Sequence, residues 1–308
     1  MMTCVCMNPA LDKTIELDGL NVGGLNRVRR ALYDATGKAV NVAIVLARLG
    51  DEARLIGVNY ADGGKAVEQR LTGEGVTSEF VWLEGALRVN IKALDTRTGV
   101  VTEINESGAP VDASAVARAE ALIDDAARTS DFVALTGSLP PGIDAGFYRR
   151  AIERNAGRAR FVLDCDGERL REGILAHPFL IKPNRAELSQ LCGCELGTRA
   201  DIVRRARELC AAGVMWVAVS LGGEGAVLVG AKEAYYAPAL DLPVRSTVGA
   251  GDSMVAGLMH GFALDGSAAT ALKWGAACGN ASVMTEGTRL IDVDALPRLL
   301  DALRVEPI

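Results

Sequence analysis

The sequence predicts an α/β protein in which helices cover both faces of a mainly parallel sheet. Short apolar runs alternate with amphipathic segments of helical period along most of the chain. The composition, with 49% hydrophobic and 23% charged residues, is typical of a globular protein. A chain of 308 residues has room for a large core. We therefore expect a single domain over residues 1–308, with a smaller excursion from it.

Apolar runs that are short and continuous are predicted to be buried strands. In chain order they are Thr3–Met7, Ala53–Val58, Phe132–Leu135, Phe161–Leu163, Phe179–Ile181 and Met215–Ser220. Other segments carry apolar residues three or four positions apart, which predicts helices that face a core. These are Val40–Leu49, Val67–Leu71, Ser114–Ala127, Ala145–Glu153, Ala186–Leu191, Asp201–Ala211, Ala250–Phe262, Ala268–Met284 and Val293–Leu303. In such a sheet a ligand binds at the carboxyl ends of the strands.

Two regions depart from this alternation. Lys13–Leu17 and Arg88–Glu103 resemble half-exposed antiparallel strands, the second folded as a hairpin at Asp95–Gly99. We expect a small discontinuous sheet, from about residues 13–36 and 88–106, that covers the crevice as a lid. An extra edge of the main sheet is the alternative. The short link Ser107–Pro110 predicts that lid and body move as hinged parts.

Composition and charge argue against several kinds of partner. The formal net charge is -6 and only 5% of residues are aromatic, which is unfavourable for binding nucleic acid. No run approaches the roughly 18 apolar residues of a membrane span, and no basic region precedes an apolar one as in a signal peptide. Seven scattered cysteines suit a reducing compartment. We therefore expect a cytoplasmic protein without a nucleic-acid or membrane partner.

The most informative segment is Ser246–Ser253, which reads Ser-Thr-Val-Gly-Ala-Gly-Asp-Ser and leads into the helical run Met254–Phe262. Its small residues let the backbone approach a ligand, and the amides at a helix N-terminus favour an anion. A carboxylate in such a turn opposes a phosphate. Asp252 is therefore either the N-cap of the helix or a base beside a transferring group.

Two other segments follow predicted strands. Ser220–Ala226 contains three glycines and fits either a second loop around a nucleotide or a hairpin connection. Lys182–Glu187 opens a helix, and its Asn184 and Glu187 have two interpretations. An amide and a carboxylate can hold Mg²⁺ through its waters. The sequence Asn-x-x-Glu is also that of a capping box.

Polar residues in the first third of the chain lie where strands end or pair. Asn8–Asp12 places a carboxylate after the first strand, where a sugar hydroxyl can bind, and Gly37–Asn41 brings a cation and an amide to a helix start. Arg88, Asn90 and Lys92 alternate onto one face of the lid hairpin. That stripe either meets a sugar phosphate or is a solvated strand face.

Taken together and in this order, the segments resemble the ribokinase-like sugar kinases, specifically their phosphofructokinase-B branch. The resemblance spans nearly the whole chain and is carried by Asn8–Asp12, Gly37–Asn41, Arg88–Lys92, Thr102–Glu106, Gly137–Gly142, Lys182–Glu187, Ser220–Ala226, Ser246–Ser253 and Gly287–Thr288. It implies a three-layer α/β/α domain with a β-sheet lid. It also implies phosphorylation of D-fructose 1-phosphate by ATP with Mg²⁺. Kinases of tagatose 6-phosphate or fructose 6-phosphate, and a non-catalytic sugar-phosphate sensor, are the alternatives.

The resemblance further implies a role for each matching residue. Asp252 would be the general base, and the amides of Gly249, Ala250 and Gly251 would stabilise the transferring phosphoryl group. The sugar phosphate would be bound by Asp12, Arg27, Gly37, Lys38, Asn41, Arg88, Asn90 and Ser138. ATP would be bound by Lys182, Asn184, Ser220, Gly222, Gly225, Thr247 and Asn280. Mg²⁺ would lie at Asn184 and Glu187, through water, and a monovalent cation near Val248 and Gly287 is a further candidate.

The sequence departs from the family pattern Gly-Gly-Lys-Gly at Thr36 and Ala39. A side chain at each position narrows the allowed backbone conformations and takes up space beside the substrate. The departure therefore bears on the sugar pocket more than on the chemistry, because Asp252 and its glycines match the family pattern. In the family the lid often forms the contact of a homodimer, so the resemblance implies a dimer through the lid.

Overall fold

Within residues 1–287 and 289–308, which the computed structural model describes, ten strands form one sheet. In spatial order they are β14 (Glu306–Pro307), β13 (Ala234–Ala237), β12 (Ala226–Val229), β11 (Trp216–Ser220), β10 (Leu180–Ile181), β9 (Arg160–Asp164), β8 (Phe132–Thr136), β1 (Met2–Cys6), β4 (Ala53–Asp62) and β5 (Thr77–Ala86). Neighbouring strands pair in parallel from β5 to β11. The remaining three add an antiparallel edge. Thr288 of the Gly287–Thr288 motif lies outside the described residues.

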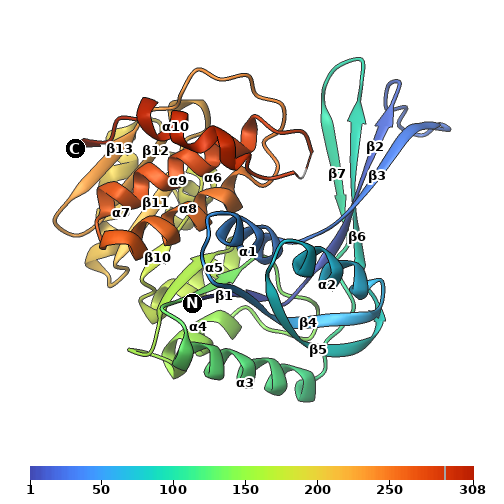
Figure 1. Cartoon of the computed structure of the whole chain (residues 1–308), viewed down its shortest axis with the longest axis horizontal. Coiled ribbons are helices and arrows are strands. Elements are labelled where there is room, and N and C mark those ends of the chain that lie inside the picture. Colours follow the sequence, from blue (N-terminus) through green and yellow to red (C-terminus); the bar gives the residue numbers. More distant parts are fainter. Residues whose placement is uncertain (288) are drawn as a thin grey trace.

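Helices cover both faces of this sheet, as Figure 1 shows. One face packs against α1 (Lys38–Arg48), α2 (Gly64–Gly73), α8 (Ala250–Asp265), α9 (Ala268–Val283) and α10 (Leu296–Ala302). The other packs against α3 (Ala113–Thr129), α4 (Phe147–Arg154), α5 (Gly167–Gly173), α6 (Arg185–Cys192) and α7 (Arg199–Ala211). Strand β1 serves both cores, because successive side chains of a strand point to opposite faces. Cys4 and Cys6 contact the first core, and Val5 contacts the second.

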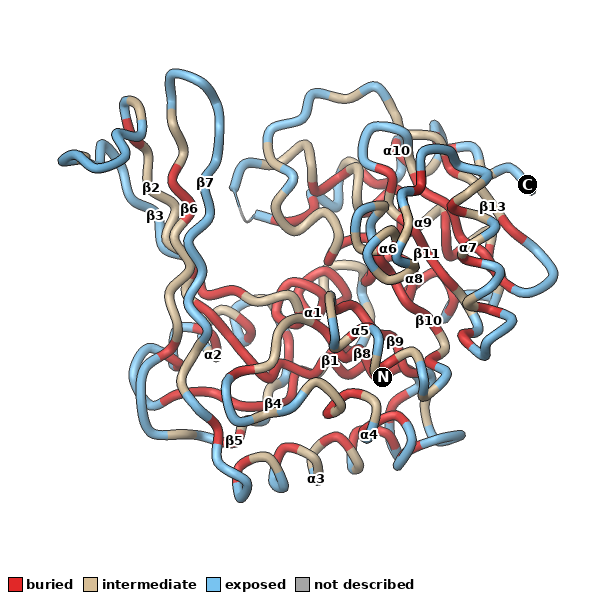
Figure 2. Tube along the Cα trace, turned by 180° about the vertical axis from the view of Figure 1, so that it is seen from behind, coloured by how far each residue is buried: buried red, intermediate tan, exposed pale blue. Residues whose placement is uncertain are grey.

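The predicted α/β class with a mainly parallel sheet is confirmed, and the differences lie at the sheet edges. Strand β5 was not predicted from the sequence, because this edge strand is half exposed and lacks a continuous apolar run. Strands β12 and β13, which are only four residues long, were also not predicted. Figure 2 shows that buried residues are concentrated in the strands of the body and in the helix faces that cover them.

A second, four-stranded sheet projects from the body (Figure 1). Its spatial order is β3 (Val28–Thr36), β2 (Ala10–Leu17), β6 (Arg88–Asp95) and β7 (Val101–Asn105). The predicted hairpin is confirmed as the antiparallel pair β6–β7, and the alternative of an extra edge on the main sheet is wrong. The prediction of antiparallel pairing is wrong for β2 and β6, which pair in parallel. The chain passes through β4 and β5 of the main sheet between them, so β6 enters in the direction of β2.

Helices α8 and α9 approach each other closely because glycines form their contact. A Cβ on Gly257 would lie 2.5 Å from the carbonyl oxygen of Trp274, and one on Gly261 would lie 2.6 Å from the Cα of Ala271. A Cβ on Gly275 would lie 2.7 Å from Leu258. These contacts leave no space for a side chain. The glycines therefore fix α8, and with it the turn Ser246–Ser253, against the rest of the body.

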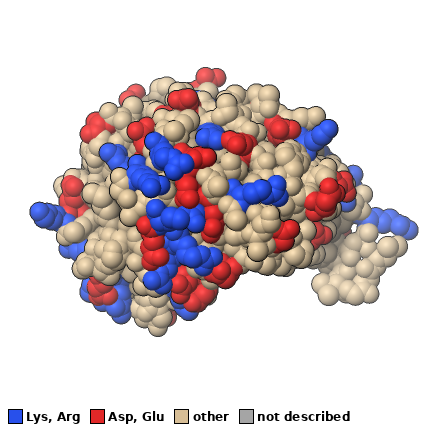
Figure 3. Space-filling view, turned by 90° about the horizontal axis from the view of Figure 1, so that it is seen from below, with Lys and Arg blue, Asp and Glu red and all other residues tan. Residues whose placement is uncertain are grey.

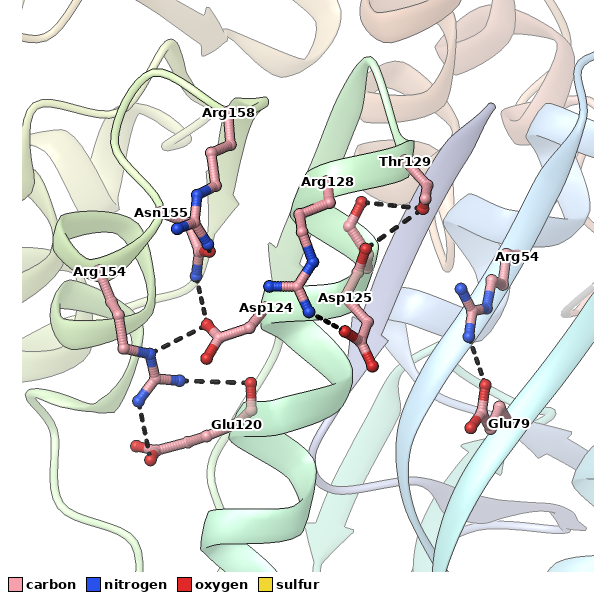
Figure 4. Close-up of polar contacts among 11 residues, drawn as sticks. Arg54, Glu79, Glu120, Asp124, Asp125, Arg128, Thr129, Arg154, Asn155 and Arg158 are labelled. Carbon is pink, nitrogen blue, oxygen red and sulfur yellow. Dashed lines mark hydrogen bonds and ion pairs between the residues drawn. The ribbon is translucent and has the colours of Figure 1, made fainter.

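The outer surface carries many ion pairs. Between α3 and α4, Arg154 pairs with Glu120 at 3.0 Å and with Asp124 at 2.9 Å (Figure 4). Within α3, Arg128 pairs with Asp125. On the face seen from below, Lys and Arg lie among Asp and Glu (Figure 3). Exposed pairs of this kind contribute about 0–1 kcal/mol each.

No helix in the described part of the chain has both the length and the apolar character needed to cross a membrane.

Candidate active site

A cavity of about 720 Å³ is enclosed by the small sheet, the carboxyl ends of several body strands and the N-terminus of α8. Most of the site residues suggested by the sequence line it: Asp12, Gly37, Lys38, Asn41, Arg88, Asn90, Lys182, Asn184, Glu187, Ser220, Gly222, Gly225, Thr247, Gly249, Ala250, Gly251, Asp252 and Asn280. Arg27 and Ser138 do not line it. Arg27 is exposed just before β3, and the Ser138 hydroxyl accepts a hydrogen bond of 3.0 Å from Asn8.

Asp252 lies buried in the first turn of α8. The N-cap of this helix is Gly249, at a φ of 79°, and no side chain caps it, so the N-cap interpretation of Asp252 is wrong. The side-chain nitrogen of Asn41 donates to Oδ2 of Asp252 at 2.8 Å. Burial raises the pKa of Asp252, although Lys38 and the Asn41 hydrogen bond oppose this. The result is a carboxylate that is more basic than an exposed aspartate.

The turn before α8 brings amides and a cation together. The Ala250 N–H donates to the Thr247 carbonyl at 3.3 Å, and Gly251 follows in the first helical turn. A Cβ on Gly251 would lie 3.3 Å from Nζ of Lys182, so this buried ammonium sits against the turn. The positive end of the helix dipole and the Lys182 charge both favour an anion here.

A residue not identified from the sequence, Asp164, links the two lysines of the cavity. It is 1% exposed, and its carboxylate pairs with Lys38 at 3.0 Å and with Lys182 at 3.3 Å. Burial alone would raise the pKa of Asp164, but the two lysines outweigh it and hold the pKa below its usual value. Burial alone would lower the pKa of Lys38, but Asp164 and Asp252 outweigh it and raise the pKa. Lys38 is therefore held as a cation, and the Asp164 carboxylate fixes the positions of both ammonium groups.

The sequence did contain a signal for Asp164. It follows the predicted strand Phe161–Leu163 directly, at the carboxyl end of β9, just as the Asn8–Asp12 segment follows the first strand. Aspartate at the end of a parallel strand is a candidate site residue by the same rule.

The inner face of the small sheet is polar. The Asn90 side-chain nitrogen donates to Oδ1 of Asp12 at 3.0 Å, and Lys92 pairs with Oδ2. The side-chain oxygen of Asn90, Oδ1, is buried without a partner. Glu103 and Asn105, which were not among the site residues suggested by the sequence, also line the cavity. A ligand hydroxyl can donate to the unpartnered oxygen of Asn90, since an amide oxygen is an acceptor.

Arg88 has a structural environment that the sequence did not suggest. Its guanidinium donates to the Asn8 carbonyl at 3.0 and 3.2 Å and to the Glu106 carbonyl at 3.0 Å. Burial lowers its pKa, although Cys6 and Asp12 oppose this. Arg88 therefore ties the base of the small sheet together while it lines the cavity.

At the other end of the cavity, Asn184 and Glu187 form the capping box of α6. The Glu187 N–H donates to Oδ1 of Asn184 at 2.9 Å, and the Asn184 N–H donates to Oε2 of Glu187 at 2.8 Å. Both residues also line the cavity, and Oε1 of Glu187 takes no part in the box. Since Mg²⁺ uses one or two carboxylates and keeps several waters, the pair fits Mg²⁺ as well as a cap. No cluster of three His, Cys, Asp or Glu side chains suited to a metal occurs among the described residues.

The region beyond Ser220 is lined by small and apolar residues. They are Gly222, Gly223, Gly225, Pro238, Ala239, Leu240, Leu242, Val244, Ala276 and Val283. Gly225 has a φ of 97°, and a Cβ there would lie 2.1 Å from the Ala237 carbonyl oxygen, so the loop requires glycine. A mainly apolar wall with a few polar groups suits a planar base. Asn280 borders it, with its side-chain nitrogen donating to the Ala276 carbonyl at 2.8 Å.

The two departures from the family pattern lie in different surroundings. Thr36 lines the cavity, and its hydroxyl donates to Oδ1 of Asn41 at 3.3 Å. Ala39 is 1% exposed and packs into the core between α1 and the main sheet. The expectation that Ala39 takes up space beside the substrate is wrong, because this position in the first turn of α1 faces the sheet.

Comparison with known proteins places the chain among sugar kinases. Residues 6–295 match the pfkB family of carbohydrate kinases. The 1-phosphofructokinase of Rhodobacter capsulatus is 40% identical over 261 residues, 83% of this chain and 82% of the relative. That of Vibrio cholerae is 34% identical over 305 residues, 98% and 95% of the two chains. Phosphofructokinase-2 from Escherichia coli in complex with potassium has a TM-score of 0.91 at 26% identity, covering 98% of each chain.

Proposed function

The chain belongs to the pfkB family of carbohydrate kinases, and on this basis we propose that it transfers phosphate from ATP to D-fructose 1-phosphate, yielding fructose 1,6-bisphosphate. Relatives named 1-phosphofructokinase, at 34% and 40% identity, support this acceptor. The observation that carries the proposal is the buried Asp252, which lies in the same cavity as two fixed lysines and a helix N-terminus. Those are the groups that phosphoryl transfer requires.

In the proposed reaction Asp252 accepts the proton of the acceptor hydroxyl as that oxygen attacks the γ-phosphate. The raised pKa of Asp252 suits it to this role. Lys182 and the amides of Gly249–Gly251 stabilise the charge that develops on the phosphoryl group. Lys38 holds the phosphoryl group or the acceptor from the opposite side. Asp164 keeps both ammonium groups in place, so little reorganisation is needed when the substrates bind.

The two substrates would occupy opposite ends of the cavity. The acceptor lies against the inner face of the small sheet, where Asp12, Asn90 and Asn41 bind hydroxyls. The adenine lies against the apolar wall beyond Ser220. Asn184 and Glu187 would hold Mg²⁺, which neutralises phosphate charge when bound. The Escherichia coli neighbour is in complex with potassium, which supports a monovalent cation in this chain as well. We place that cation near Val248 and Gly287.

Closure of the small sheet over the acceptor would exclude water and protect ATP from hydrolysis. We place the hinge of this motion at the base of the sheet, where Arg88 joins the Asn8 and Glu106 carbonyls. We place the reaction in the cytoplasm, because the cysteines of the described chain are free thiols.

A second acceptor is favoured by one observation. A solved structure of Escherichia coli phosphofructokinase-2 in complex with fructose-6-phosphate has a TM-score of 0.90 at 25% identity, which supports a 6-phosphate sugar as the substrate. In that case the phosphate and the attacking hydroxyl exchange ends of the sugar, while Asp252 and the nucleotide end keep their roles.

The test is ADP release from Mg·ATP by the purified protein, with fructose 1-phosphate, fructose 6-phosphate, tagatose 6-phosphate and fructose offered separately. A kcat/KM highest for fructose 1-phosphate, with the bisphosphate identified as the product, is the expected result. Preference for a 6-phosphate would replace the acceptor and keep the mechanism. Tight binding of a sugar phosphate without ADP release would instead support a sensor.

A further inference from the structure

We infer that Thr36 is a positioning residue for the reaction: its hydroxyl holds the Asn41 amide in place while the amide nitrogen donates to Asp252. The inference rests on the proposed function, because it assigns Asp252 as the base. At position 36 the family pattern has glycine, which has no hydroxyl, whereas this chain has threonine.

Three elements bring these side chains together. Thr36 is the last residue of β3, Asn41 lies in the first turn of α1, and Asp252 lies in the first turn of α8. The Thr36 hydroxyl donates to Oδ1 of Asn41 at 3.3 Å, and Nδ2 of Asn41 donates to Oδ2 of Asp252 at 2.8 Å. The three residues are 3%, 4% and 7% exposed, so water does not readily replace either hydrogen bond.

The orientation of Asn41 is decided by Asp252 and held by Thr36. An amide side chain presents a donor on one side and an acceptor on the other, and a half-turn about its last bond exchanges them. Turned the other way, Asn41 would place its oxygen against the Asp252 carboxylate, and two acceptors would face each other. The Asp252 carboxylate only accepts, so it selects the orientation in which the Asn41 nitrogen faces it. The Thr36 hydroxyl donates to the Asn41 oxygen on the side away from Asp252 and so holds the amide in place.

The orientation matters for the base in two ways. Because Asn41 occupies Oδ2 of Asp252, Oδ1 is left to accept the proton of the acceptor hydroxyl. The same bond favours the ionised carboxylate. The other charged groups that act on Asp252 are Lys38 on α1, Lys182 after β10 and Asp164 on β9. None of these depends on the Thr36 hydroxyl, so its loss is expected to act through Asn41.

The first experiment compares Thr36→Val, which removes the hydroxyl with little change of shape, with Thr36→Ser, which keeps it. With the acceptor that the wild type prefers, T36V is expected to lower kcat about 10-fold, within the usual range for loss of support to a general base. It is also expected to move the acid limb of the kcat/KM profile to higher pH and to leave KM for ATP within about twofold. T36S is expected to recover most of the lost activity.

The matched control is Thr3→Val, at the amino end of β1. Thr3 is fully buried, and its hydroxyl shares a hydrogen bond of 2.8 Å with Ser130, so T3V also removes a buried hydrogen bond. Because this end of the strand is opposite the cavity, T3V is expected to lower the melting temperature without moving the pH profile. An unmoved profile in T36V, or the same movement in T3V, would overturn the inference.

A stability cycle tests the inference without any turnover and therefore separates its failure from that of the proposed function. Asp252→Asn is introduced into the wild type and into T36V, and the change in melting temperature at pH 7 is compared. If Thr36 supports the ionised Asp252 through Asn41, D252N raises the melting temperature more in T36V, by about 2 °C or more. Equal changes in the two backgrounds would show that the residues are not coupled and that Thr36 does not position Asn41.

Discussion

At the residue scale, the site is governed by two buried aspartates with opposite environments. The carboxylate of Asp164 forms ion pairs with two lysines, which hold its pKa low despite burial. Asp252 has one amide donor and lies near Asp164, and burial holds its pKa high. The first carboxylate is suited to stay ionised and fix cations, while the second is suited to take up a proton. Environment, and not residue type, separates their roles.

Asp252→Asn removes the proposed base and keeps the shape and polarity of the side chain. We expect kcat to fall on the order of 100-fold or more, because general base catalysis contributes about that much. Binding of ATP, followed by isothermal titration calorimetry, should change little and serves as the control for folding. A kcat near that of the wild type would remove Asp252 from the role of base.

The same pair of aspartates predicts opposite effects on stability. Because the pKa of Asp252 is raised on folding, ionised Asp252 lowers stability as pH rises above the unfolded pKa of about 4. D252N is therefore expected to increase the free energy of unfolding at pH 7 by on the order of 1 kcal/mol. This gain should shrink as pH falls toward 4, and urea unfolding at several pH values measures it.

Asp164→Asn is expected to act in the other direction. The pKa of Asp164 is lowered on folding, so its ion pairs contribute stability above pH of about 4 and lose it as pH falls through the folded pKa. At pH 7, D164N leaves the buried Lys182 without its carboxylate and should cost about 3 kcal/mol. This is the low end of the range, because the Lys38 side chain is 40% exposed. Unfolding free energies equal to the wild type would contradict the fixed-cation role.

At the scale of the elements, the position of the catalytic turn depends on how α8 meets α9. The carbonyl of Trp274 and the side chain of Cys278 fill the space where Gly257 would carry a Cβ, at 2.5 and 2.9 Å. Backbone atoms cannot move aside as the end of a flexible side chain can. The orientation of Asp252 at the start of α8 therefore requires glycine at position 257.

Gly257→Ala is expected to force the two helices apart and to cost about 1–3 kcal/mol, the usual range for overpacking. Gly279→Ala is the matched control on α9, where the nearest atom to an added Cβ is 3.7 Å away. Because alanine lowers the entropy of the unfolded chain, G279A should stabilise by about 0.4–1 kcal/mol. Urea unfolding measures the free energy of unfolding of both variants. Equal changes in the two variants would show that the close contact of α8 and α9 does not exclude a side chain at Gly257.

At the scale of the whole molecule, the small sheet has two different faces. Its inner face carries Asp12, Asn90 and Glu103, which line the cavity. The strand register places Tyr33, Lys13, Ile91 and Ile104 in one row across the opposite face. Tyr33 and Ile104 are 58% and 59% exposed. Three of these four side chains are aromatic or aliphatic, and we propose that a second copy of the sheet buries this row, in the homodimer that the resemblance implies.

Ile104→Lys is expected to weaken such a dimer, because it places a charge in the apolar row. Sedimentation velocity at micromolar concentration should show a dimer for the wild type and a shift toward monomer for I104K. Met215→Lys, at a residue 58% exposed on the body, is the matched control and should leave the dimer intact. A wild type that is monomeric under these conditions would exclude the proposed dimer.

The sequence by itself determined the fold class and most of the lining of the cavity. Periodicity and continuous apolar runs are local properties, so strands such as Phe132–Leu135 and the turn Ser246–Ser253 could be placed from the chain alone. The half-exposed β5 carries a weaker local pattern and was missed. Arg27 and Ser138, taken over by resemblance, lie outside the cavity lining, because motif position does not fix where a side chain points.

The tertiary structure alone decided which groups meet. Asp164 and Lys38 are 126 positions apart in the sequence, and Asn41 and Asp252 are 211 apart, so no local pattern links them. The crossover through β4 and β5 made β2 and β6 parallel. The orientation of α1 buried Ala39, whereas Thr36, at the end of β3, lies beside the cavity. Hydrogen bonds and ion pairs depend on distances of a few ångströms between distant segments. Only the packing of the sheets and helices sets those distances.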